Sequence, residues 1–107
     1  MQMAFVDPDN PLAAELLQET AEAYFAACRK MVASLEALRA FDRAAPSPVQ
    51  DERRTTQRTG LLDDAAQRVH FVLIQREAMK LSGSETFFEQ YGIPFEVRAR
   101  LGSRRQK

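Results

Sequence analysis

Few residues of this 107-residue chain have the chemistry of a catalytic or metal site. The chain holds one histidine, His70, and one cysteine, Cys28. His70 lies in the apolar stretch 69–74, and Gln67 stands where a metal site in a helical bundle would place a carboxylate. Cys28 falls in a row of apolar residues, with no base identifiable near it. We therefore expect packing roles for both, and predict no catalytic residue, no cofactor and no metal.

Charged residues are more informative by position than by number. The 15 basic and 15 acidic side chains cancel, so no net charge draws the whole chain to nucleic acid or to an anionic membrane. Glu15, Glu19 and Glu22 share one helical face, which we interpret as solvated surface. The last ten residues, in contrast, hold five basic side chains and no acid: Arg98, Arg100, Arg104, Arg105 and Lys107.

The segment before this basic end has a pattern with two interpretations. Residues 84–101 read as a short helix, a turn at Gly92-Ile93-Pro94 and a second short helix, which resembles a helix-turn-helix DNA reader. That resemblance implies contacts with DNA phosphates, although Phe88 stands where the motif usually has a small residue. The alternative, which we favour, is an amphipathic cap on the core followed by a solubilising tail that could also meet an acidic partner.

The elements that position these residues begin with one long helix over residues 11–42. Asn10 suits the cap and Pro11 the first helical position, and no glycine or proline interrupts the chain before Asp42. Apolar side chains recur at alternating steps of four and three, which is a heptad pattern: Leu17, Ala21, Tyr24, Cys28, Met31, Leu35 and Leu38. Phe25 and Val32 widen this face, as in a helical bundle.

A second helix is predicted over residues 48–81. Ser47 to Gln50 reads as a capping box, but residues 53–59 are polar on every face, so a start near Thr59 is the alternative. The predicted core positions are Val69, Val72 and Leu73, and the helical segment that contains them has apolar side chains on nearly every face. Such a helix is covered on several sides.

Two short helices complete the predicted chain, over about 85–91 and 94–101. Ser82 with Glu85 reads as a capping box, with Ser84 as the alternative cap, and Gly92 and Gly102 are expected to end the two helices. Two-turn helices are unstable alone, so their apolar side chains must pack on the long pair: Phe87, Phe88, Tyr91, Ile93, Phe95, Val97 and Leu101. We expect residues 1–102 to form one domain and 103–107 a disordered basic tail.

These elements predict an all-α protein, a long antiparallel helical hairpin with two short C-terminal helices. Because two long helices alone leave apolar faces uncovered, we expect a homodimer that forms a four-helix bundle. A groove for a hydrophobic ligand or a partner helix, lined by Tyr24, Phe25, Met31 and Phe71, is a less favoured interpretation of the same side chains.

The function expected from this architecture is a non-catalytic interaction or scaffold protein with an unidentified partner. The alternative is a small DNA-associated regulator that uses the 84–101 helix pair and the basic tail, and an enzyme is the least favoured class. The first eleven residues have no basic cluster and only a short apolar run, and the single cysteine is unpaired. We therefore expect a cytoplasmic protein with no membrane segment.

Overall fold

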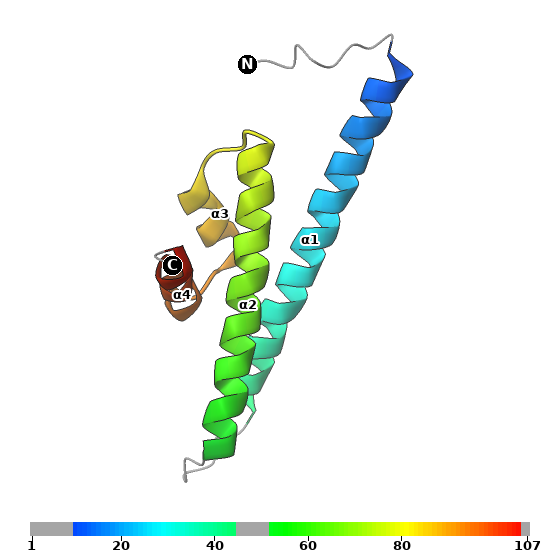
Figure 1. Ribbon diagram of the computed structural model, residues 1–107. Helices are drawn as coiled ribbons and strands as arrows, with labels where there is room; N and C mark the ends of the chain where they lie inside the picture. Colours follow the sequence, from blue (N-terminus) through cyan, green and yellow to red (C-terminus); the bar gives the residue numbers. More distant parts are fainter. Residues whose placement is uncertain (1–9, 45–51, 106–107) are drawn as a thin grey trace.

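The computed structural model describes residues 10–44 and 52–105, with side chains as far as Leu101. Helix α1 (Pro11–Arg43) and helix α2 (Glu52–Ala78) pack together as a long hairpin. Helix α3 (Ser84–Tyr91) and helix α4 (Phe95–Arg105) follow, and α4 packs on α2 (Figure 1). No strand occurs in the described ranges. The predicted all-α fold, with its hairpin and two short helices, is confirmed.

Helix α1 begins at the predicted residues, with Asn10 as the cap and Pro11 as the first helical residue. The Asn10 side-chain oxygen accepts hydrogen bonds from the backbone N–H groups of Leu12 and Ala13, at 3.0 and 3.4 Å. Pro11 follows at the first position of the helix, where it has no N–H that needs a partner. The first turns of α1 therefore form a capped helix end.

Helix α2 contains the polar stretch 53–59, so the later start near Thr59 is wrong. The predicted capping box at Ser47–Gln50 lies outside the described residues. The helix ends at Ala78, three residues earlier than expected, because Lys80 takes a left-handed conformation with φ of 64°. The N–H groups of Lys80 and Leu81 then donate to the carbonyls of Glu77 and Arg76, which closes the helix end.

The ends of α3 are both set by glycine. Gly83 is the N-cap, with a left-handed backbone and no side-chain hydrogen bond, so the predicted capping box between Ser82 and Glu85 is wrong. The Glu85 carboxylate instead accepts a hydrogen bond from Arg98 at 3.0 Å. At the other end Gly92 is left-handed, as predicted, and the N–H of Ile93 donates to the carbonyl of Phe88.

Helix α4 continues beyond the predicted end at Leu101. Gly102 does not stop the helix, which runs to Arg105, so part of the expected disordered tail has helical backbone. A glycine ends a helix only when it adopts the left-handed conformation, and the positive-φ glycines of the described chain are Gly83 and Gly92.

One apolar core joins the four helices. Met31 and Leu35 of α1 meet Val69 and Val72 of α2, and all four side chains are almost completely buried. The short helices are anchored through buried residues, as expected: Phe87, Ile93, Val97 and Leu101. Phe95 was expected in this group, but it stands at the first position of α4 with 80% of its surface exposed.

Two glycines with opposite roles give a test of this architecture. Gly92→Ala introduces a side chain at φ of 60°, and its Cβ would lie 3.2 Å from a guanidinium nitrogen of Arg39. We expect the free energy of unfolding to fall by roughly 1–2 kcal/mol. Gly60→Ala is the matched control, because Gly60 lies inside α2 with no atom within 4 Å of an added Cβ. This variant should gain up to about 1 kcal/mol.

Chemical denaturation of the wild type and both variants measures these differences. A Gly92→Ala variant as stable as the wild type would contradict the assigned left-handed helix end.

Candidate interaction surface

The N-terminal part of α1 extends beyond the end of α2. Tyr24 of α1 accepts a hydrogen bond from Arg76 in the last turn of α2, and α1 continues for three more turns past this contact (Figure 1). Of residues 11–20, which we call the overhang, only Ala13 is even partly buried. The overhang spans roughly 15 Å at 1.5 Å per residue. Among the residues that the structure describes, the overhang is therefore an exposed helical surface.

The overhang is amphipathic. Leu12, Leu16 and Leu17 are 62%, 55% and 41% exposed. Glu15 and Glu19, four residues apart, lie on the neighbouring side of the helix next to Leu12. Since the apolar rows of the buried part of α1 continue into the overhang, the helix carries a core-like face that α2 does not reach.

A second apolar strip runs along the side of α1, next to the face that α2 covers. We call it the lateral stripe, and its members recur at helical spacing: Ala14, Leu17, Ala21, Phe25 and Val32. Phe25 is 57% and Val32 39% exposed, and Ala21 is half-buried. Phe25 and Val32 line an open groove of about 400 Å³ together with Cys28, Arg29 and Tyr91 of α3. The groove thus lies between the lateral stripe and α3.

The predicted seam residues divide into three groups by exposure. Six are buried in the core: Cys28, Met31, Leu35, Leu38, Val69 and Val72. Ala21, Tyr24 and Leu73 are half-buried, whereas Leu17 and Phe25 are exposed. The four residues of the alternative groove do not meet at one site, because Met31 is fully buried and Phe71 is exposed on α2.

The predicted basic contacts are engaged within the chain where the structure describes them. Arg98 pairs with Glu85 at 3.0 Å and lies over the ring of Phe88 at 4.3 Å. Arg100 pairs with Asp63 of α2 at 3.2 Å. The side chains of Arg104 and Arg105, and the whole of Lys107, lie outside the described residues. The two described arginines thus act first as links between helices.

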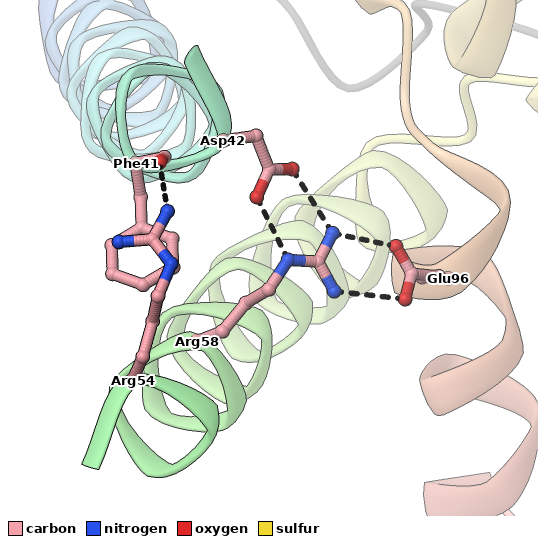
Figure 2. A network of polar contacts seen from close by, with 5 residues as sticks. All are labelled: Phe41, Asp42, Arg54, Arg58 and Glu96. Atoms are coloured by element: carbon pink, nitrogen blue, oxygen red, sulfur yellow. Dashed lines mark hydrogen bonds and ion pairs between the residues drawn. The ribbon is translucent and has the colours of Figure 1, made fainter. Parts of the chain in front are cut away.

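Arg58 of α2 forms a polar contact with two carboxylates (Figure 2). Its guanidinium donates two hydrogen bonds to Asp42 of α1, at 2.8 and 3.0 Å, and two to Glu96 of α4, at 2.9 and 2.8 Å. These bonds to Arg58 lower the pKa of both carboxyls below their ordinary values, and the two carboxylates raise the pKa of the guanidinium. One side chain therefore joins three helices.

Arg54, one turn earlier in α2, lies over the ring of Phe41, with its guanidinium carbon 4.1 Å from the ring centre. It also donates to the Phe41 carbonyl at 3.0 Å, which is one of the last carbonyls of α1 (Figure 2). Together with Arg58, this contact explains why the polar stretch 53–59 is helical. Its residues pack through arginine rather than through aliphatic side chains.

Two further arginines hold α3 in place. Arg39 of α1 donates to the carbonyls of Tyr91 and Gly92, both at 3.0 Å, at the C-terminal end of α3 where a positive charge is favourable. Arg76 donates to the Tyr24 hydroxyl and to the Ser82 carbonyl, and lies over the Phe87 ring. Burial raises the pKa of Tyr24, so the hydroxyl that accepts this bond stays protonated at neutral pH.

His70 borders a cavity of about 530 Å³ between α2, α3 and α4. Apolar side chains line it together with Ser84, Glu77 and two arginines, and Arg76 and Arg98 already bind Ser82 and Glu85. Within the described ranges, His, Cys, Asp and Glu form no group of three that could hold a metal ion. Both arginines of the cavity are therefore engaged within the chain.

The roles of Arg39, Arg54, Arg58 and Arg76 were not predicted, although the sequence carries a signal for two of them. Arg58 and Arg76 fall on the same helical row as Leu62 and Val69, at steps of four and seven. A basic residue that continues an apolar row points toward the core, where it needs an acceptor. The acceptors themselves come from distant parts of the chain, which spacing does not reveal.

No family model, curated protein or solved structure matches this chain. No helix of the described ranges is long and apolar enough to cross a lipid bilayer.

The Arg58 contact predicts an acid-sensitive contribution to stability. Because Arg58 lowers the pKa of Asp42 and Glu96 in the fold, its contribution is complete above their ordinary values of 3.8 and 4.5. It is lost as the pH falls through the lowered values. We expect Arg58→Met to lose about 1 kcal/mol at pH 7 and to show a weaker decline between about pH 5 and pH 3 than the wild type.

Urea denaturation across pH 3–7 measures this effect. Arg68→Met is the control, because Arg68 forms a single 3.8 Å pair with Asp64 one turn away on the same helix. An Arg58→Met variant whose stability falls with acid as steeply as that of the wild type would contradict the assigned contact.

Proposed function

We propose that the protein is a non-catalytic helical interaction module that works as a homodimer, with α1 as its contact element. The observation that carries this proposal is the distribution of exposed apolar side chains. Of the nine large apolar residues exposed in the described chain, five lie on α1: Leu12, Leu16, Leu17, Phe25 and Val32. Exposed apolar side chains gathered on one helix in this way are typical of a binding surface rather than of a free monomer.

The physical argument for a partner is the cost of leaving this face in water. Each exposed leucine of the overhang gains roughly 1–2 kcal/mol when another helix covers it. A second copy supplies such a helix without a further gene product, and closed two-fold pairs are the commonest assemblies of soluble proteins. A pair of hairpins also gives the four long helices of a bundle.

The alternative function, a DNA-associated regulator, stays a prediction. The described basic residues of the 84–101 helix pair are bound to carboxylates, Arg98 to Glu85 and Arg100 to Asp63. DNA phosphates would have to compete with these contacts. No observation on the described residues favours this function over the interaction module.

Size-exclusion chromatography with light scattering tests the proposal. We expect wild-type protein at tens of micromolar to have twice the 12.1 kDa mass of the chain. Replacing Leu16 and Leu17 by Glu should raise the dissociation constant at least tenfold, because charges would then lie on the covered face. The helical circular dichroism of the variant should be retained, since both side chains are exposed in the monomer.

Ala33→Glu is the matched control, because Ala33 is exposed on α1 and lies off both the leucine face and the lateral stripe. It should leave the mass unchanged. A wild-type chain that stays monomeric up to about 100 µM would overturn the proposal.

A further inference from the structure

The exposed leucines of the overhang continue the side of α1 that α2 covers. Leu17 lies seven residues before Tyr24, which is bonded to Arg76 of α2. Leu16 lies eleven residues before Ala27, which is buried. Both spacings return to the same side of a helix. Because α2 ends two residues after Arg76, a helix that covers these leucines lies beyond the end of α2, on the side of α1 that α2 occupies (Figure 1).

The position of α2 decides in which direction a second α1 can run along this side. If both α1 helices ran in the same direction, the packed parts of the two chains would lie at the same end. Both α2 helices would then have to occupy the space between the two α1 helices. Packed helices lie about 8–10 Å apart, which leaves no room for another helix between them. When the second α1 runs in the opposite direction, the two packed parts lie at opposite ends and do not collide.

We infer that two copies of the chain associate through an antiparallel contact between their overhangs, with the two-fold axis beside Ala14. Leu12 and Leu16 are one turn apart on the same side of the contact. An axis midway between them places Leu12 of each copy level with Leu16 of the other. The inference rests on the proposed homodimer and specifies its arrangement: the two hairpins meet end to end, in place of a compact side-by-side bundle.

The ends of the helices limit this register in both directions. With the axis beside Ala14, Pro11 of the second copy lies level with Leu17, short of the end of α2. An axis one turn nearer to α2 would place Pro11 of the second copy level with Tyr24, where α2 already packs. An axis one turn farther away would place Leu16 beyond Pro11, the first helical residue of the second copy.

The acidic side chains of α1 stay apart in this register. Glu15 precedes Leu16 and lies roughly 100° around the helix from it, on the side turned away from the second copy. The two Glu19 side chains are ten residues apart along the contact, which is about 15 Å. Glu22 lies outside the paired stretch, residues 11–17. The leucines therefore meet without bringing like charges together.

Cross-linking between two different variants tests the direction and the register. One chain carries Leu12→Cys and the other Leu16→Cys, both with Cys28→Ser. Mild oxidation of the mixture should give at least about fivefold more disulfide between the two variants than within either, because only the mixed pair is level across the contact. Identical positions lie four residues apart along the contact, about 6 Å. Ala33→Cys, exposed on α1 outside the contact, is the matched control and should not cross-link.

Small-angle X-ray scattering of the wild-type dimer gives an independent readout that needs no substitution. Two α1 helices that overlap over residues 11–17 span about 90 Å, whereas side-by-side hairpins keep the length of one α1, about 50 Å. We expect the longer maximum dimension at protein concentrations where light scattering shows a dimer.

The outcomes separate this arrangement from the homodimer itself. A dimer of compact shape, or one in which each cysteine variant cross-links mainly to its own copy, would overturn the end-to-end contact and leave the proposed homodimer intact. A monomeric wild type would remove both and leave the leucines to a different protein.

Discussion

The structure depends on a difference in length between two helices. Helix α1 has 33 residues and α2 has 27, and the contact between Tyr24 and Arg76 marks where their shared core ends. The apolar rows of α1 do not end there, because Leu16 and Leu17 continue them into the overhang. The same face of α1 thus packs on α2 along part of the helix and is exposed in the overhang.

Arginine side chains link the helices in the packed part of the molecule. Arg58 connects α2 with α1 and α4, and Arg39 holds the end of α3 against α1. A guanidinium suits this task because its fork of donors can satisfy two acceptors at once while its stem packs on apolar surface. The bonds are partly exposed, so their contribution is geometric specificity more than stability.

Much of this fold could be predicted from periodicity and from helix-end residues. The heptad rows of α1 predicted buried Met31 and Leu35, and Gly92 predicted the end of α3 correctly. The end of α2 was missed because Lys80, and not a glycine, adopts the left-handed conformation there. The exposure of Leu17 could not be predicted either. The spacing of apolar residues identifies the apolar face of a helix, but it does not show whether a neighbouring helix is long enough to cover that face.

Hydrogen–deuterium exchange at two protein concentrations, one well above and one well below the dissociation constant, tests the central claim most directly. If a second copy covers the free face of α1, the backbone amides of residues 12–22 gain protection at the higher concentration. Those of residues 62–72, in the shared core, do not change. Overhang amides that exchange equally fast at both concentrations, in a sample that light scattering shows to be dimeric, would contradict the account.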